Sequence, residues 1–127
     1  MAATSGVRIS RLTGVLGARL DGVTLSPDMD PDDVAVLRSA LVDYEVLVVP
    51  GQALSPEEQA GFSHLLGDCS PVPFVQAVPG HPEVIKVVKE ANETEVFNFG
   101  GVWHSDFSFL DAPPAFTVLH ALDVPDV

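Results

Sequence analysis

The chain has 127 residues, the length of one ordinary domain, and its hydrophobic fraction of 46% suffices for a packed core and excludes a disordered chain. Its formal net charge of -12 disfavours nucleic acid and anionic membrane as partners, because phosphate binding requires a basic face. The single cysteine, Cys69, excludes an internal disulfide, and neither a signal peptide nor a membrane span is expected, so the predicted location is the cytoplasm.

The first elements are predicted to be strands. Residues 1–7 are expected to form a flexible tail. The apolar residues between Val7 and Leu12 indicate a short strand, and Ala18–Leu20 is expected to pair with it across a turn at Gly14 and Gly17.

Two helices follow, and each has a clear start signal. Asp30 is expected to cap the first helix, with Pro31 at its first position and acidic residues in its first turn. The second helix opens with a capping box, Ser55 with Glu58, and Gly67 is expected to end it. The apolar residues that recur at helical spacing are Val34, Leu37, Leu41 and Tyr44 in the first helix and Phe62, Leu65 and Leu66 in the second.

The remaining elements are predicted to be strands and loops. Residues 46–49 are continuous and apolar, which is typical of a strand buried on both faces, and the prolines of residues 68–82 indicate a long loop. Further strands are expected at 84–88, 102–109 and 115–122, the last two separated by a turn at 111–114. Helices followed only by strands favour an α+β, mainly β fold with an antiparallel β core.

The triplet His104-Ser105-Asp106 carries the clearest chemical signal. Residues two apart on a strand share a face, so His104 and Asp106 would point the same way as adjacent ligands of one metal. An imidazole with a carboxylate suits non-haem Fe(II) when a second histidine completes the set. The alternative is an ordinary surface His–Asp pair. Trp103, Phe107 and Phe109 share a face and are expected to pack in the core behind the metal face.

Longer motifs around this triplet resemble the taurine dioxygenase family of Fe(II)- and 2-oxoglutarate-dependent dioxygenases. Residues 98–110, with the Pro113-Pro114 pair, are similar to the iron-binding segment of that family. Residues 16–23, 44–52 and 55–59 are similar to its upstream motifs, in the same order. The resemblance covers nearly the whole chain from about residue 8.

The resemblance implies a double-stranded β-helix, or jelly roll, with N-terminal helices. It also implies Fe(II) held by His104 and Asp106, 2-oxoglutarate as cosubstrate, dioxygen, and hydroxylation of a C–H bond in a small-molecule substrate. Asn98 could reach the substrate or cosubstrate, or simply form the turn before Gly100. Val72 lies where the taurine enzyme has a histidine that binds the substrate sulfonate, so taurine is an unfavourable substrate.

The resemblance also implies a distal histidine ligand and a 2-oxoglutarate-binding arginine, and neither has a match in residues 8–127. These residues therefore match the N-terminal portion of such a domain, an incomplete jelly roll, because that fold needs about eight strands. His120 could be a third ligand if its strand neighbours that of His104, but a half-buried strand histidine is the favoured interpretation, and His64 and His81 are expected at the surface. Two ligands should hold iron weakly, so the 127-residue chain alone is predicted to be inactive.

Two other interpretations remain open. One is a non-catalytic jelly-roll remnant that serves as an interaction module. The other is one half of a split enzyme, completed by a C-terminal chain. Unpaired strand edges would favour pairing with such a chain or with a second copy as a homo-oligomer.

Overall fold

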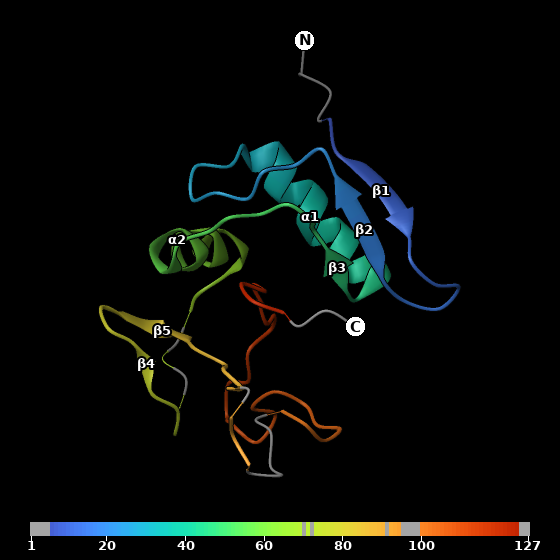
Figure 1. Cartoon of the computed structure of the whole chain (residues 1–127). Coiled ribbons are helices and arrows are strands. Elements are labelled where there is room, and N and C mark those ends of the chain that lie inside the picture. Colours follow the sequence, from blue (N-terminus) through green and yellow to red (C-terminus); the bar gives the residue numbers. More distant parts are fainter. Residues whose placement is uncertain (1–5, 70, 72, 91, 95–99, 125–127) are drawn as a thin grey trace.

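The computed structural model describes residues 6–69, 71, 73–90, 92–94 and 100–124. Figure 1 shows β1, β2 and β3 beside α1, with α2 next to them and the β4–β5 hairpin against α2. We call residues 6–67 the N-terminal unit and residues 100–124 the site segment. The elements are β1 (Arg8–Arg11), β2 (Ala18–Asp21), α1 (Pro31–Tyr44), β3 (Leu47–Val48), α2 (Pro56–Leu66), β4 (Ala77–Val78) and β5 (His81–Ile85).

The first sheet has the order β1-β2-β3. β1 pairs with β2 antiparallel, with Ile9 opposite Leu20, which confirms the predicted hairpin. The turn between them closes with a hydrogen bond from Leu12 N to Gly17 O (2.9 Å), and Gly17 has φ 89°, a conformation that favours glycine.

The prediction for residues 46–49 was wrong in one respect. Only Leu47–Val48 is a strand, it pairs parallel with β2, and Val46 and Val48 remain 47% and 45% exposed. The apolar run identified a strand correctly, but burial on both faces requires covering layers. Within the described residues β3 is an edge strand with a neighbour on one side only.

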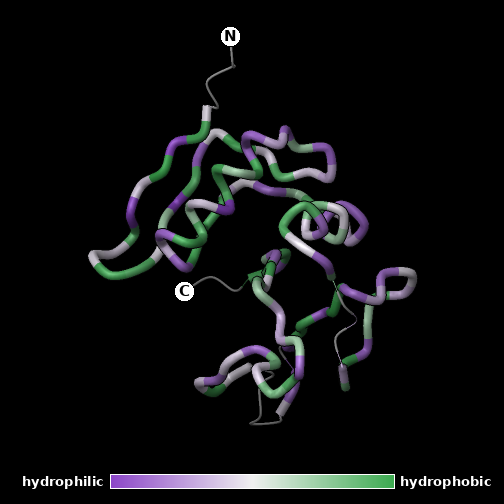
Figure 2. The backbone as a smooth tube through the Cα atoms, turned by 180° about the vertical axis from the view of Figure 1, so that it is seen from behind, coloured by the Kyte–Doolittle hydropathy of each residue, from purple (hydrophilic) through white to green (hydrophobic). Residues whose placement is uncertain are grey.

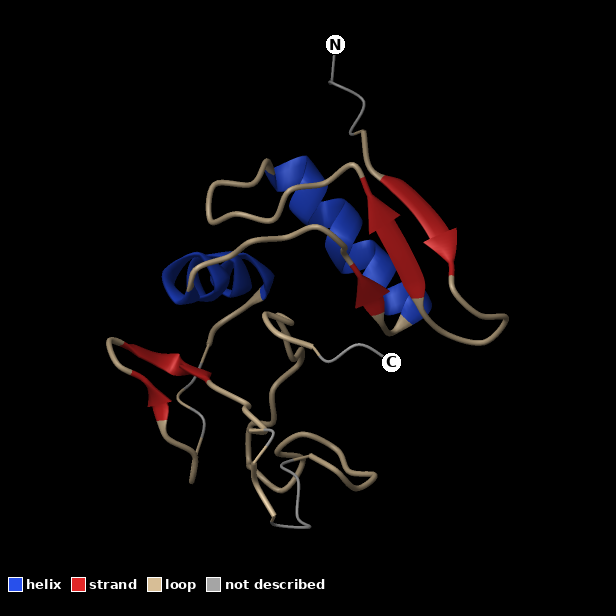
Figure 3. Ribbon diagram, in the orientation of Figure 1, coloured by secondary structure: helices blue, strands red, loops and turns tan. Residues whose placement is uncertain are grey.

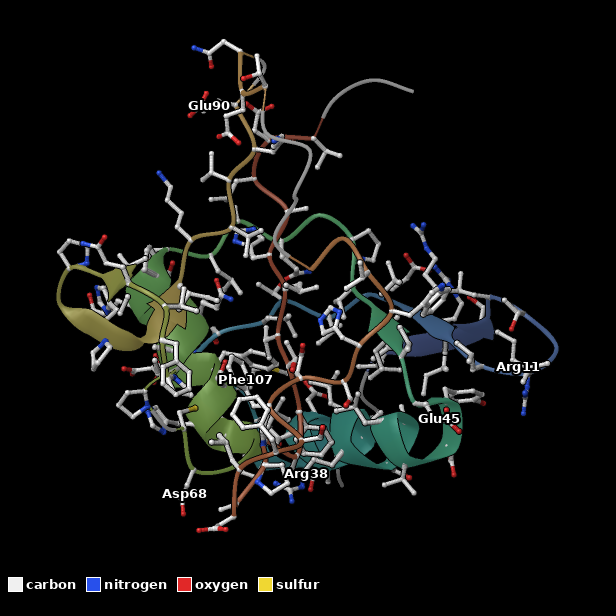
Figure 4. The ribbon with its side chains drawn as sticks, turned by 90° about the horizontal axis from the view of Figure 1, so that it is seen from below. Arg11, Arg38, Glu45, Asp68, Glu90 and Phe107 are labelled. Carbon is white, nitrogen blue, oxygen red and sulfur yellow. The ribbon has the colours of Figure 1, made fainter. Side chains whose placement is uncertain are left out.

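Both helices begin where their caps predict. The Asp30 side chain accepts from Asp32 N at 2.9 Å, with Pro31 as the first helical residue. At α2 both halves of the capping box are present: Glu58 N donates to Ser55 Oγ (3.2 Å) and Ser55 N donates to Glu58 Oε2 (2.8 Å). Arg38, labelled in Figure 4, donates from Nη1 to Leu66 O at 2.6 Å, which ties α1 to the C-terminal end of α2.

The core lies between the first sheet and the two helices. Along β1, β2 and the helices, Figure 2 shows hydrophobic and hydrophilic residues interspersed, as expected of elements with one face on a core. Val7 packs against this core, although the sequence placed it at the end of the tail; residues 1–5 lie outside the described residues. The buried cluster consists of Ala18, Leu20, Leu25, Leu37, Phe62 and Leu66.

The region after α2 differs most from the sequence-based expectation. Residues 68–82 were predicted to be loop, yet β4 lies within them and β5 begins at His81, so His81 is a half-buried strand residue. The strand expected at 84–88 ends at Ile85. Beyond β5 the described residues form loops throughout, as Figure 3 shows, so the strands predicted at 102–109 and 115–122 are absent.

The physical reason is that no strand among the described residues pairs with these segments. A strand is stable only when neighbours satisfy its backbone donors and acceptors, and alternating side chains cannot replace them. Phe107, labelled in Figure 4, adopts φ 46° and turns the chain back, with Leu110 N bonding to Phe107 O at 3.1 Å.

The predicted core role of the site-segment aromatics was also wrong. Trp103 is fully exposed and Phe109 is 70% exposed. Phe107 and Phe109 contact each other, with ring centroids 6.1 Å apart, rather than packing under a sheet. The described residues thus form an α+β arrangement of two helices and two small sheets. Among them no helix is long and apolar enough to cross a membrane.

Candidate metal centre

His104 and Asp106 lie side by side, as the sequence predicted, but on a loop. His104 Nε2 is 3.1 Å from Asp106 Oδ1, and His104 Nδ1 is 2.7 Å from Val102 O. A carbonyl oxygen only accepts hydrogen bonds, so Nδ1 carries the proton. In the neutral ring Nε2 then holds its lone pair toward Asp106. The local turn, rather than strand geometry, brings the two groups together.

His104 and Asp106 form an ion pair when the ring is protonated, as in an ordinary surface His–Asp pair, and the same two atoms could instead hold a metal ion. A neutral Nε2 and a carboxylate oxygen are both acceptors, so their approach is favourable only when a proton or a metal ion lies between or beside them. The Val102 carbonyl first, and then the Asp106 carboxylate, raise the pKa of His104 above its ordinary value against the opposing effect of desolvation. An imidazole nitrogen with a carboxylate oxygen is a donor set that fits non-haem Fe(II).

The second oxygen of Asp106 has a partner of its own. Thr117 Oγ1 donates to Asp106 Oδ2 at 2.7 Å. This bond leaves Oδ1 as the oxygen that faces His104. The sequence gives no signal for Thr117, because a spacing of eleven residues does not indicate a contact between two loop positions.

The stretch that carries Thr117 is docked on the N-terminal unit. Gln59 on α2 donates from Nε2 to Val118 O at 3.2 Å, and the Val118 side chain packs against the core. His120 Nε2 lies 3.3 Å from Gln52 O. Figure 1 shows this part of the chain, in red, returning toward α2 and β3.

Gln52 is a second residue whose role the sequence did not reveal. Its side chain accepts from Leu25 N at 2.8 Å and donates to Val23 O (3.1 Å) and Pro50 O (3.0 Å). It therefore fixes the loop on which His120 rests. An isolated glutamine after Pro50-Gly51 gives no sequence signal for this role beyond the motif resemblance.

An open hollow of about 680 Å³ adjoins the His104 ring and is lined by residues 100–104. Gly100 adopts φ 72°, and a Cβ there would lie 3.5 Å from His104 Cε1. The contact with the imidazole would be an ordinary one, so it is the positive φ of this turn that favours glycine. The hollow is a shallow depression that is largely open to solvent.

The other predicted site residues have different outcomes. His120 is half-buried as predicted, but it lies on a loop rather than a strand, with Nε2 3.3 Å from Gln52 O, and His64 is exposed, 3.6 Å from Glu83. Asn98 and Val72 lie outside the described residues, so their predicted substrate roles stay predictions. Within the described ranges, no group of three or more histidine, cysteine, aspartate or glutamate side chains gathers in a way that could hold a metal ion.

Comparison with curated proteins gives relatives at about 30% identity. An alkylsulfatase of Acinetobacter baylyi is 30% identical over 124 residues, covering 97% of this chain and 38% of that protein. An alpha-ketoglutarate-dependent sulfate ester dioxygenase of Pseudomonas putida is 31% identical over 115 residues, covering 90% of this chain and 36% of that protein. The chain thus spans well under half the length of these relatives.

Solved structures and a family model agree with these relatives. A taurine dioxygenase from Burkholderia xenovorans superposes with a TM-score of 0.58 at 35% identity, over 62% of this chain and 29% of that one. A second Burkholderia xenovorans structure, a putative alpha-ketoglutarate-dependent taurine dioxygenase, gives 0.59 at 30%, over 63% and 29%. The family model described as taurine catabolism dioxygenase TauD, TfdA family matches residues 8–127. This chain belongs to the TauD/TfdA family of dioxygenases.

Proposed function

We propose that this chain supplies His104 and Asp106 as two of the Fe(II) ligands of a 2-oxoglutarate-dependent dioxygenase that hydroxylates a C–H bond of a small organic substrate. The observation that carries the proposal is the convergence of His104 Nε2 and Asp106 Oδ1 at 3.1 Å. The Val102 carbonyl holds the ring in the tautomer whose free nitrogen faces that oxygen.

The iron and its cosubstrates would have one role in the reaction, and the protein's side chains would have another. Iron with 2-oxoglutarate and dioxygen supplies the oxidising power for attack on an unactivated C–H bond. The protein's own residues would hold the metal: His104 offers Nε2 and Asp106 offers Oδ1, and an open hollow lined by residues 100–104 adjoins them. The exposed pair, with side chains 48% and 40% accessible, leaves room for further ligands.

The remaining ligand is proposed to come from outside the described residues, since within them no third metal-binding side chain joins the pair. We further propose that the complete domain is a jelly roll, in which other strands cover the apolar site segment. The polypeptide of residues 1–127 by itself should then release little or no succinate. The named activities of the relatives support an enzyme over a non-catalytic module.

Sulfate esters are the first substrates to assay. One relative is named an alkylsulfatase and another a sulfate ester dioxygenase, and both align over nearly all of this chain. Taurine is the comparison compound, because two similar structures carry that name.

The test is succinate release from 2-oxoglutarate by the protein as the cell makes it, with Fe(II), dioxygen and a panel of sulfate esters. His104→Ala and Asp106→Ala should each lower the rate about 100-fold or more, because each removes a metal ligand. His64→Ala and Asp43→Ala are matched controls at exposed positions and should leave the rate unchanged. Iron-dependent succinate release that survives His104→Ala would refute the proposal.

A further inference from the structure

We propose that Thr117 is a positioning residue for the metal centre, which holds the Asp106 carboxylate so that Oδ1 alone faces the metal. This inference rests on the proposed function, and it concerns how the ligand is oriented. The direct observation is the hydrogen bond from Thr117 Oγ1 to Asp106 Oδ2 at 2.7 Å, while Oδ1 lies 3.1 Å from His104 Nε2. The two carboxylate oxygens therefore have different partners.

An unrestrained carboxylate can rotate, or it can bind a metal with both oxygens. A hydroxyl that donates to Oδ2 stabilises one rotamer and draws electron density toward that oxygen, which favours binding through Oδ1 only. Binding through one oxygen would occupy a single coordination position and would leave other positions for the cosubstrate and dioxygen.

The hydroxyl that bonds to Asp106 does not come from the serines nearest to it in sequence. Ser105 and Ser108 are nearer to Asp106 in sequence, but their hydroxyls bond to each other at 2.7 Å. The hydroxyl that reaches Asp106 comes from a residue eleven positions away. Local turn formation thus explains the serine pair and does not explain Thr117.

Thr117 is held by the folded part of the molecule. Its neighbour Val118 packs against the core and accepts from Gln59 Nε2 on α2 at 3.2 Å. Two residues further on, His120 bonds to Gln52 O at 3.3 Å. A path of contacts therefore runs from α2 through Val118 and Thr117 to Asp106. These contacts hold the exposed loop that carries Asp106 in a fixed position relative to the N-terminal unit.

The test is Mn(II) binding, followed by electron paramagnetic resonance, to the protein as the cell makes it. Thr117→Val removes the hydroxyl at nearly constant shape and should weaken Mn(II) affinity by about 10-fold to 100-fold, the usual cost of losing a partner of a metal ligand. Thr117→Ser keeps the hydroxyl and should restore most of the affinity. Ser108→Ala, a matched loss of a hydroxyl in the same loop, should leave it unchanged.

The visible spectrum of bound Co(II) is the second readout, because a merely structural role would not change the coordination of the ion. Thr117→Val should alter the spectrum, whereas Thr117→Ser should not. Because Thr117 is exposed, the melting temperature of Thr117→Val should equal that of the unmodified protein. If Thr117→Val lowers it, Thr117→Ala is measured instead, with the same expected results.

The outcomes separate the two proposals. If His104→Ala and Asp106→Ala abolish Mn(II) binding while Thr117→Val binds Mn(II) and Co(II) like the unmodified protein, the positioning role is wrong and the proposed function stands. If His104→Ala and Asp106→Ala also bind Mn(II) normally, the metal centre itself is wrong and both proposals fall.

Discussion

The N-terminal unit and the site segment are held in place by different kinds of interaction. The N-terminal unit is held together by helix caps, a paired hairpin and a buried cluster. Leu20, in that cluster, is only 1% exposed. In the site segment, Trp103 and Leu119 are exposed, and order comes from a few hydrogen bonds such as Thr117 to Asp106. The difference teaches that the packed core and the proposed metal ligands lie in separate parts of the described chain.

The largest expected loss of stability comes from a substitution in the core, and it distinguishes the N-terminal unit from the site segment. Leu20→Ala removes a fully buried side chain from the core cluster and should cost about 2–5 kcal/mol of unfolding free energy. Leu119→Ala is the matched control in the site segment, where the side chain is 85% exposed, and should cost no more than about 0.5 kcal/mol. Denaturant unfolding measures both, and equal costs would mean that the site segment has a core of its own.

A second substitution tests how tightly the N-terminal unit is packed. Alanine usually stabilises a helix relative to glycine by about 1 kcal/mol. At Gly61 on α2, however, the new Cβ would lie 2.8 Å from Pro27 Cγ, so Gly61→Ala should instead cost about 1–3 kcal/mol through overpacking. The double variant with Pro27→Ala should recover much of that loss. Stabilisation by Gly61→Ala alone would show that the loop at Pro27 yields easily.

The smallest effect concerns the α2 cap. Ser55→Ala removes the hydroxyl that accepts from Glu58 N and should lower stability by about 1 kcal/mol. Thermal unfolding measures the loss. Ser63→Ala on the same helix is the control, since its hydroxyl donates to Gln59 O within the helix and caps no free amide. Similar losses from the two substitutions would contradict the capping role.

The same cap gives a pH dependence. The Ser55 backbone amide, followed by the Ser55 side chain, holds the pKa of Glu58 below its ordinary value. A lowered pKa stabilises the fold above the pKa that Glu58 has in the unfolded chain, and this stabilisation is lost as the pH falls through the lower, folded value. In Ser55→Ala, NMR titration should show the Glu58 pKa moving up toward its ordinary value. An unchanged pKa would assign the whole shift to the backbone amide.

Local chemistry made much of the N-terminal unit predictable. The caps at Asp30 and Ser55 depend on a few neighbouring residues, so their signals survive without tertiary context. The hairpin of β1 and β2 was likewise predictable because its partners are adjacent in sequence. Burial was less predictable: Val46 and Val48 have strand-like side chains, but their exposure depends on layers that the local sequence does not specify.

The sequence predicted which two residues form the candidate site, but not the backbone geometry that brings them together. The adjacency of His104 and Asp106 was anticipated from strand geometry, whereas the structure achieves it by a turn that bonds the ring to Val102. Alternating apolar residues at 102–109 indicated a strand, but periodicity cannot supply the partner that a strand requires. Thr117 was missed because its contact joins two loops.

The most direct measurement of the central claim is an anaerobic Fe(II) titration in the presence of 2-oxoglutarate, followed by visible absorption, on the protein as the cell makes it. We expect a weak charge-transfer band from chelated 2-oxoglutarate. The band should be lost in His104→Ala and in Asp106→Ala and retained in His120→Ala, whose ring bonds to the Gln52 carbonyl. A band that persists in the first two variants, or that disappears only with His120, would contradict this expectation.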